Sequence, residues 1–320
     1  MGLRAKIFRR LYWPVCRTYA RRIMGDKPAG PLTRKLYKPP FWAIHGYWPD
    51  LSAPRRFSER LWHRMLTDRD PRLTLIVDKH RVRDYVADRV GGEYLIPLLW
   101  HGSDPEEIPF QDLPSRFVLK TNHGWYSNII VEDKAKLDIG KAKAQLAAWL
   151  AVNYCLDKFL GIEWAYKNVP PEIVIEAFIG EPGAWPVDYK FWCYSGSVDF
   201  VVMHFDRARE QKTRTFMREF VPSAYALPGD GYAGDIVRPE NYDEMIRVAE
   251  TLSKDFPFMR VDLYSVGGRV FFGEMTPYPN GVETNFVPER DDLILGDLWG
   301  RGGRAVRGDG LSGRRENDMI

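Results

Sequence analysis

The alternation of apolar and polar residues predicts a mixture of helices and antiparallel strands. Apolar residues recur at helical spacing in residues 58–66, 78–90, 140–154 and 240–256. Short runs rich in β-branched and aromatic residues predict strands at 117–120, 128–131, 173–179, 188–194, 198–204, 259–264 and 269–276. Hairpins dominate this order of elements. We therefore predict an α+β fold with antiparallel sheets and not a doubly wound parallel fold.

One predicted hairpin carries a pattern of facing charges. If its loop centres on Gly268, Asp262 faces Glu274 and Arg260 faces Thr276. Side chains two residues apart share a face, so these four form one polar surface. Two opposed carboxylates repel at a cost of up to about 1 kcal/mol, and a divalent cation such as Mg²⁺ would convert that repulsion into binding. The alternative is a surface hairpin on which Arg260 neutralises the acids.

Two lysines lie where phosphates are often bound. Lys120 ends an apolar strand and precedes the polar loop 121–128, whose backbone N–H groups are suited to an anion. The spacing of a Walker A loop is absent. Lys79 lies just inside a predicted helix, next to Asp78. For both lysines, a solvated surface position is the simpler interpretation.

Further candidates follow predicted strands. Glu176 ends a run of buried apolar residues and leads into Phe178 and Ile179, a segment suited to a flat ring such as adenine; a salt-bridge role for Glu176 is equally consistent. Four polar residues in loops after strands are suited to an acidic substrate or to solvent: His123, His204, Arg207 and Arg214. Three other histidines, His63, His80 and His101, show no metal-binding spacing.

Composition excludes several classes of protein. The net charge of +3 is close to balance, which argues against a nucleic-acid binder that works by bulk electrostatics. The three cysteines are far apart and form no CxxC pair, so we expect no disulfide framework or zinc cluster, and a reducing cytoplasm fits. No apolar run approaches the roughly 18 residues of a membrane span.

The two ends of the chain differ from the rest. Residues 1–24 combine basic residues with apolar residues at helical spacing, which is typical of a helix on an anionic membrane surface, or of one packed on its own domain. We expect a basic N-terminal cap over residues 1–55, rich in proline and aromatic residues. Residues 299–320, rich in Gly and Arg, are expected to be a disordered tail.

Taken together, the motifs resemble the TupA-like ATP-grasp family of surface-polysaccharide biosynthesis. The segments that carry the resemblance are Asp78–His80 with Val82–Val86, Tyr94–Leu99, Phe117–Gly124, Asp188–Phe191, Phe256–Tyr264 and Phe272–Thr276. The resemblance implies an ATP-grasp domain over residues 56–298. Its central lobe would span about 117–180 and its C-terminal lobe about 181–298, with a nucleotide clamped between them.

The resemblance also implies the roles of individual residues. Lys79 and Lys120 would contact the ATP phosphates, and Arg260, catalytic together with Lys120, would steady the transferring phosphoryl group. The remaining nucleotide contacts would come from Asn122, His123, Gly124, Glu176, Ala177, Phe178, Ile179, Asp188 and Lys190. The metal ligands for Mg²⁺ would be Asp262, Glu274 and Thr276. Candidate substrate contacts are His204, Arg207, Arg214 and Asn280, although Asn280 also suits a turn.

The sequence departs from the family pattern in two places. The loop after Gly124 reads Trp125, Tyr126 and Ser127, where the family usually has glycines. We expect these side chains to restrict φ to negative values and to crowd the approach of ATP. Thr276 takes a position where many ATP-grasp enzymes have Asn, and its hydroxyl can still serve a metal site.

The sequence thus predicts an ATP- and Mg²⁺-dependent ligase. The expected reaction joins an amine to the carboxylate of a small or lipid-linked saccharide through an acyl phosphate, on the cytoplasmic side, with peripheral membrane contact through residues 1–24. The alternatives are a glycosyltransferase of the same pathway and an ATP-grasp module that binds a nucleotide without catalysis. No nucleic-acid partner is expected.

Overall fold

The computed structural model describes residues 25–157, 160–181, 183, 185–205, 212–223, 225, 231–232, 234–284, 286 and 288–300. The predicted membrane-facing helix, Arg207 and most of the predicted tail lie outside the described residues. The expectation of a tail from residue 299 is wrong at its start, because residues 299 and 300 end helix α9. Among the described residues, no helix combines the length and the apolar character needed to cross a bilayer.

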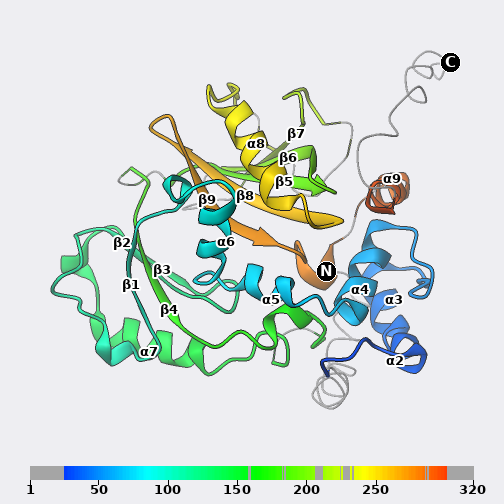
Figure 1. Ribbon diagram of the computed structural model, residues 1–320, viewed down its shortest axis with the longest axis horizontal. Helices are drawn as coiled ribbons and strands as arrows, with labels where there is room; N and C mark the ends of the chain where they lie inside the picture. Colours follow the sequence, from blue (N-terminus) through cyan, green and yellow to red (C-terminus); the bar gives the residue numbers. More distant parts are fainter. Residues whose placement is uncertain are drawn as a thin grey trace.

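The helices lie in different parts of the molecule (Figure 1). Those near the ends of the described chain, α2–α4 and α9, lie together at one side of the molecule, whereas α5 packs against β9 and α6 against α8. The α-helices are α2 (Pro31–Leu36), α3 (Lys38–His45), α4 (Phe57–Thr67), α5 (Pro71–Val77), α6 (Val82–Arg89), α7 (Ile139–Leu150), α8 (Tyr242–Ser253) and α9 (Glu289–Gly300). Short 3-10 helices are η1 (Gly92–Tyr94), η2 (Pro105–Glu107), η3 (Lys134–Lys136), η4 (Trp164–Tyr166) and η5 (Gly281–Glu283).

One predicted helix begins later than expected. We predicted a helix over residues 78–90 that included Lys79, but α6 begins at Val82. The Asp78 Oδ1 atom accepts hydrogen bonds from the backbone N–H groups of His80 at 2.9 Å and Arg81 at 3.2 Å. An aspartate side chain that bonds nearby backbone donors competes with the helix and fixes a turn. Lys79 therefore lies in a turn before the helix.

The first sheet is antiparallel, with strand order β1-β4-β2-β3. Its strands are β1 (Leu98–Gly102), β2 (Phe117–Thr121), β3 (Asn128–Val131) and β4 (Ile173–Ala177). The buried side chains of α7, Ala142 and Leu146, join the core of this sheet, so the amphipathic helix covers one face. We call this sheet with α7 the central lobe; it begins at β1, before residue 117 where the sequence predicts its start (Figure 1).

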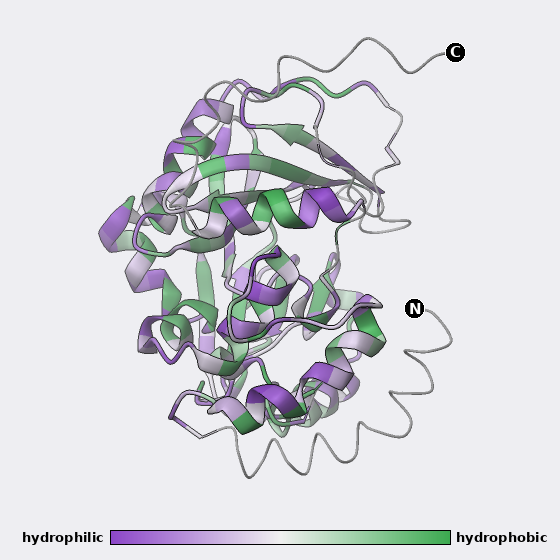
Figure 2. Ribbon diagram, turned by 90° about the vertical axis from the view of Figure 1, so that its right-hand side faces the viewer, coloured by the Kyte–Doolittle hydropathy of each residue, from purple (hydrophilic) through white to green (hydrophobic). Residues whose placement is uncertain are grey.

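The second sheet is also antiparallel, with order β7-β6-β5-β8-β9. Its strands are β5 (Asp188–Tyr194), β6 (Ser197–Phe205), β7 (Lys212–Met217), β8 (Phe258–Val266) and β9 (Arg269–Thr276). Helix α8 packs against β5, β6 and β8. In Figure 2 hydrophobic and hydrophilic stretches alternate along the helices, as expected where one face is buried.

The β8–β9 hairpin contains both pairs that the sequence predicts, but its loop is not centred on Gly268, because a bulge next to Asp262 shifts the ladder so that Val266 pairs with Arg269. Asp262 pairs with Glu274 and Arg260 with Thr276. The turn uses Gly267 and Gly268 at φ values of 56° and 76°, in the left-handed region that favours glycine.

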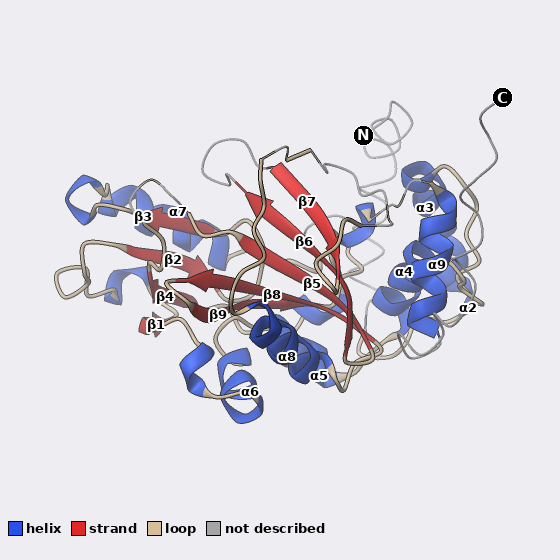
Figure 3. Cartoon of the chain, turned by 90° about the horizontal axis from the view of Figure 1, so that it is seen from above, coloured by secondary structure: helices blue, strands red, loops and turns tan. Residues whose placement is uncertain are grey.

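The two lobes meet along β9. A bridge pairs Leu95, just before β1, with Phe272 in β9, and α5 packs against β9. Seen from above, the two sheets lie next to each other (Figure 3). These contacts bring the polar hairpin close to the turn that carries Lys79.

Candidate nucleotide-binding site

The charged residues of β8 and β9 form one hydrogen-bonded cluster. Arg260 donates to both carboxylate oxygens of Asp262, from Nε at 2.7 Å and from Nη2 at 2.8 Å. The same Nη2 atom lies 2.8 Å from Glu274 Oε1 and 3.2 Å from Thr276 Oγ1. The predicted common face is therefore confirmed. Arg260 is only 7% exposed, so the alternative of a surface hairpin is wrong. The part of that alternative in which Arg260 neutralises the acids is present, because Arg260 contacts both of them.

Strand β5 extends the cluster with a second cation, Lys190. Lys190 is paired with Asp262 in the β5–β8 ladder, and its Nζ forms an ion pair with that carboxylate. It also lies 2.7 Å from Asp188 Oδ2. Lys190 thus keeps two buried acids together that would otherwise repel each other.

The two hairpin acids have pKa values shifted in opposite directions. Burial raises the pKa of Asp262 to about 6, although Arg260 and Lys190 act against the shift. Burial also opposes ionisation of Glu274, but Arg260, Lys190 and Lys79 outweigh it and hold the pKa well below its usual range. The carboxylates in turn raise the pKa of Arg260 against the effect of burial. Glu274, whose side chain is 38% exposed, is the accessible acid of the pair.

Lys79 connects this cluster to the central lobe. Its Nζ donates to the carbonyl oxygen of Gly124, and its backbone N–H donates to Asn122 O at 3.1 Å. Burial lowers the pKa of Lys79, whereas the negative charge of Glu274 raises it. The lysine beside the polar loop and the acid on β9 therefore interact across the two lobes.

The other predicted phosphate-binding lysine is held by a carboxylate. Lys120 forms an ion pair with Glu176, which also accepts from Arg83 Nη1 at 3.0 Å. The salt-bridge alternative for Glu176 is thus present in the structure. Sequence reasoning missed Arg83, which lies near the start of α6 and has no pattern of its own.

Asn122 and His123 shape the polar loop from inside. The Asn122 Nδ2 atom donates to Asp78 Oδ1 at 2.9 Å and to Pro170 O at 2.9 Å, and its Oδ1 accepts from Glu172 N at 2.7 Å. The His123 ring nitrogens lie 3.1 Å from Val152 O and 3.2 Å from Asn122 Oδ1. Both side chains are buried, so the structure gives them a positioning role.

The ring of Tyr154 leaves no room for a side chain at position 124. A Cβ atom at this position would lie 2.2 to 2.4 Å from the ring of Tyr154. The expectation that the bulky residues of this loop keep φ negative is wrong, because Tyr126 has a φ of 54° and is 90% exposed. Left-handed backbone costs a non-glycine residue about 1–2 kcal/mol, but it turns the Tyr126 ring towards solvent.

The predicted adenine-binding segment follows β4. The backbone N–H of Ala177 donates to Pro97 O at 3.0 Å. Phe178 and Ile179 are half-buried, and the Arg116 guanidinium lies 5.6 Å from the centre of the Phe178 ring. Within the described residues, no main-chain hydrogen bond engages the N–H groups of Phe178 and Ile179.

The candidate substrate residues are scattered. His204 lies opposite Asp188 on the same face of the sheet. Thr213 pairs with His204, so the next residue, Arg214, lies on the other face of the sheet. Arg214 lines a separate cavity of about 210 Å³ with Tyr232 and Asp235. Asn280 is exposed at a φ of 53° and precedes η5, which supports its turn-forming alternative.

Glu163 was not predicted from the sequence. It is buried in an irregular segment before η4, where no periodicity marks it. Its Oε2 accepts from Trp125 Nε1 at 3.3 Å, and its Oε1 lies 2.2 Å from the place of a Cβ on Gly281. Burial raises its pKa to about 7. Glu163 thus connects the polar loop to the segment after β9.

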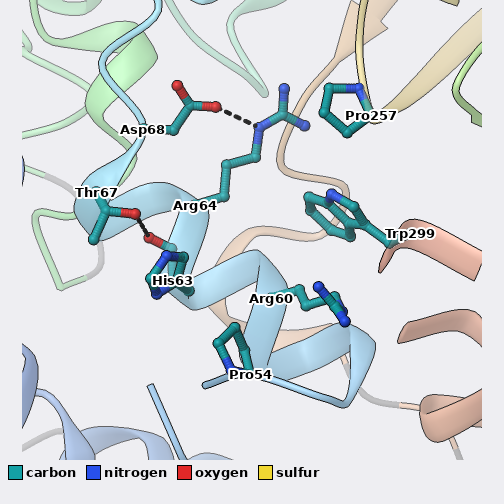
Figure 4. A pocket seen from close by; sticks show the side chains of 8 residues that line it. All are labelled: Pro54, Arg60, His63, Arg64, Thr67, Asp68, Pro257 and Trp299. Atoms are coloured by element: carbon teal, nitrogen blue, oxygen red, sulfur yellow. Dashed lines mark hydrogen bonds and ion pairs between the residues drawn. The ribbon is translucent and has the colours of Figure 1, made fainter. Parts of the chain in front are cut away.

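A further cavity lies away from this cluster (Figure 4). It has a volume of about 250 Å³ and contains Arg64, whose Nε lies 3.3 Å from Asp68 Oδ2. The lining residues are Pro54, Arg60, His63, Arg64, Thr67, Asp68, Pro257 and Trp299. The set includes none of the site residues predicted from the sequence.

A comparison of the sequence with models of protein families finds a match, which spans the motifs and the buried cluster described above. The family model described as TupA-like ATPgrasp matches residues 59–299. The chain belongs to this TupA-like ATP-grasp family. The match confirms the resemblance stated above, and the two antiparallel sheets agree with the α+β ATP-grasp fold. A comparison with curated proteins found no match.

Solved ATP-grasp structures are distant from this TupA-like chain. D-alanine–D-alanine ligase from Bacillus anthracis, complexed with ATP, is 16% identical, with a TM-score of 0.36 over 64% of this chain and 55% of the ligase. The ATP-grasp ligase PsnB, with minimal precursor, Mg and ADP, is 14% identical, with a TM-score of 0.39 over 76% and 65%. N5-carboxyaminoimidazole synthase from Aspergillus clavatus is 14% identical, with a TM-score of 0.35 over 63% and 44%. The chain therefore spans less than two thirds of each of these proteins.

Proposed function

We propose that this protein is an ATP- and Mg²⁺-dependent ligase that joins a carboxylate to an amine. Family membership supports a ligase-like enzyme. The observation that carries the proposal is the hydrogen-bonded cluster of Arg260, Asp262 and Glu274 on the hairpin, with Lys79 bound to the polar loop of the central lobe. A clamp that binds a triphosphate needs cations and metal ligands from both lobes at one place.

The donor set of the hairpin fits magnesium. Asp262, Glu274 and Thr276 offer only oxygen atoms, which Mg²⁺ prefers. Both oxygens of Asp262 are engaged by Arg260 and Lys190, so metal binding there requires those cations to turn from the carboxylate towards phosphate. When bound, Mg²⁺ would supply positive charge next to the phosphate oxygens.

The protein's own cations suit phosphoryl transfer. Such a reaction needs mainly positive charge around the transferred group and alignment of donor with acceptor. Lys79 and Lys120 would bind the phosphates, with Lys120 released from Glu176, while the segment from Ala177 to Ile179 would hold adenine. Arg260 would stabilise the charge on the transferring group.

The proposed reaction has two steps. A carboxylate oxygen of the substrate attacks the γ-phosphorus of ATP, which breaks the bond to ADP and gives an acyl phosphate. The amine nitrogen then attacks the acyl carbon, phosphate leaves with the bonding electrons, and the amine loses a proton. Negative charge develops on oxygen in both steps, so Arg260 serves twice.

We place this reaction in the assembly of a surface polysaccharide on the cytoplasmic side. The carboxylate would belong to a small or lipid-linked saccharide, for instance a uronic acid. This part of the proposal follows from the family resemblance.

The test is ADP formation from Mg-ATP, screened over uronic acids and amines. We expect Glu274→Gln to reduce turnover at least about 100-fold, as for the loss of a metal ligand beside the reacting phosphate. The matched control is Glu106→Gln, whose carboxylate is 74% exposed on η2. Equal activity of Glu274→Gln and wild type would contradict the assignment, and a thermal shift with UDP-sugars but not with Mg-ATP would favour a glycosyltransferase.

A further inference from the structure

A second group of metal-ligating side chains lies outside the nucleotide cluster. His80, His101 and Glu172 come from three separate segments, and their ligand atoms all lie within 4.8 Å of one another. The His80 Nδ1 atom is 2.7 Å from Glu172 Oε2, and the His101 Nδ1 atom is 4.0 Å from the same oxygen. No metal-binding spacing marks these histidines in the sequence, because the fold brings them together from distant positions.

Strand pairing accounts for two members of the group. In the β1–β4 ladder His101 lies opposite Val174, two residues beyond Glu172. Diagonal neighbours on adjacent antiparallel strands are within reach of long side chains. The imidazole of His101 and the carboxylate of Glu172 are therefore neighbours because of the backbone register.

The third member is fixed by the polar loop. Asn122 accepts from the backbone N–H of Lys79 and, through Oδ1, from the backbone N–H of Glu172. The His80 backbone N–H is bound by Asp78. Hydrogen bonds thus hold the segments of His80 and Glu172 together independently of their side chains, so the group is preorganised.

We propose that His80, His101 and Glu172 form a binding site for a divalent transition-metal ion of the Zn²⁺ class. Two imidazole nitrogens and one carboxylate oxygen suit Zn²⁺, Co²⁺ and Ni²⁺, whereas Mg²⁺ prefers oxygen ligands alone. Ligands at zinc distances in a tetrahedral arrangement lie roughly 3.3 Å apart. The observed separations of 2.7 and 4.0 Å lie on either side of this value, so small side-chain rotations suffice.

The surroundings suit an exchangeable ion. The side chains are 25%, 48% and 33% exposed for His80, His101 and Glu172, so water has access to complete the coordination shell. The two imidazole rings lie 4.0 Å apart, centre to centre, at 34°. Two imidazolium ions at this distance would repel each other, whereas one divalent ion would bind both rings in their neutral form. This site does not depend on the proposed ligase activity.

The experiment is titration of the tag-free full chain with Zn²⁺ by calorimetry and with Co²⁺ by visible absorption. Excess Mg²⁺ is present to occupy the oxygen ligands of the hairpin. We expect one high-affinity Zn²⁺ per chain in the wild type, with at least tenfold weaker binding in His101→Ala. His101 is half exposed, so its removal is compatible with folding, which a thermal melt verifies. His63→Ala, outside the group, is the matched control and should bind like wild type.

A second set of variants keeps the proposal falsifiable. Glu172→Gln should weaken Zn²⁺ binding as His101→Ala does, and Glu274→Gln should leave it unchanged. Absence of tight binding in the wild type, or wild-type affinity in His101→Ala, would overturn the site. Loss of binding in Glu274→Gln alone would assign the ion to the hairpin and would also overturn it.

Discussion

Arg260 and Asp262, two residues apart on β8, share two parallel hydrogen bonds of 2.7 and 2.8 Å inside the protein. This fork places one cation between both acids of the hairpin, since the same guanidinium reaches Glu274. An arginine in this geometry is not interchangeable with lysine, which lacks the planar pair of donors.

The first prediction concerns the stability of this fork. Arg260→Ala should lower the free energy of unfolding by about 3–5 kcal/mol, because it leaves buried carboxylates short of a partner. Denaturant unfolding followed by circular dichroism measures the change. Arg269→Ala, on the exposed part of the same hairpin, should change stability by less than about 0.5 kcal/mol. A similar loss in both variants would show that the hairpin, and not the buried charge, is responsible.

The second prediction is a pH dependence that arises from Glu163. Burial raises its pKa to about 7 from an ordinary value of 4.5, so the folded state binds the proton more tightly than the unfolded state. The wild type should therefore lose stability as pH rises from about 4.5 to above 7, by about 3 kcal/mol for this group. Glu163→Gln should lack this loss.

The measurement is the difference in unfolding free energy between Glu163→Gln and wild type at pH 5 and at pH 8. The difference should favour the variant more strongly at pH 8. Other titrating groups are common to both proteins and cancel. A difference that does not change with pH would mean that Glu163 titrates near its ordinary value.

The third prediction follows from the contact between Gly124 and Tyr154. Gly124→Ala should destabilise the protein by about 1–3 kcal/mol, because the added methyl group overlaps the tyrosine ring. Replacing Tyr154 by Leu in the same chain should recover part of the loss, as judged by thermal unfolding. Gly92→Ala, where no atom lies within 4 Å of the new Cβ, is the control. Failure of the double variant to recover would point to backbone conformation instead of the ring.

The fourth prediction compares Lys79, the predicted phosphate contact, with Arg214, a candidate substrate contact. Lys79→Met should weaken Mg-ATP binding at least tenfold, since its ammonium lies beside Gly124 and interacts with Glu274. Arg214→Ala should leave Mg-ATP affinity within about twofold of wild type, because Arg214 lies on the opposite face of the sheet. Calorimetric titration with a non-hydrolysable ATP analogue measures both. Equal losses would contradict the placement of the site.

Much of the candidate site follows from short-range rules. The glycines at 267 and 268 and the two-residue period of a strand are enough to predict a hairpin whose charged residues share one face. The strands around Lys120 were predicted for the same reason. The pair Asp262–Glu274 also needs the bulge next to Asp262, because a regular ladder from the pair Val266–Arg269 would place Asp262 opposite Gly273.

Other parts depend on pairing that no local pattern reveals. The histidine group needs the β1–β4 register, and β1 has no clear alternation to mark it. The sequence predicts Arg214 in a loop, which assigns it to no face, whereas the structure places it in β7. The sequence predicts Lys79 in a helix that begins at Asp78. In the structure the Asp78 side chain binds backbone N–H groups of the turn instead, and the helix begins at Val82.

The bulge in the β8–β9 hairpin separates its two ends. After the pair Asp262–Glu274, the ladder skips Gly273 and resumes at Leu263 with Phe272. A Cβ on Gly273 would lie 2.9 Å from the Tyr264 ring, so glycine allows this irregularity. Residues inserted at the Gly267–Gly268 turn would therefore lengthen only the part of the hairpin between the bulge and the turn. A fluorescent reporter attached at this turn would leave the pair Asp262–Glu274 in place.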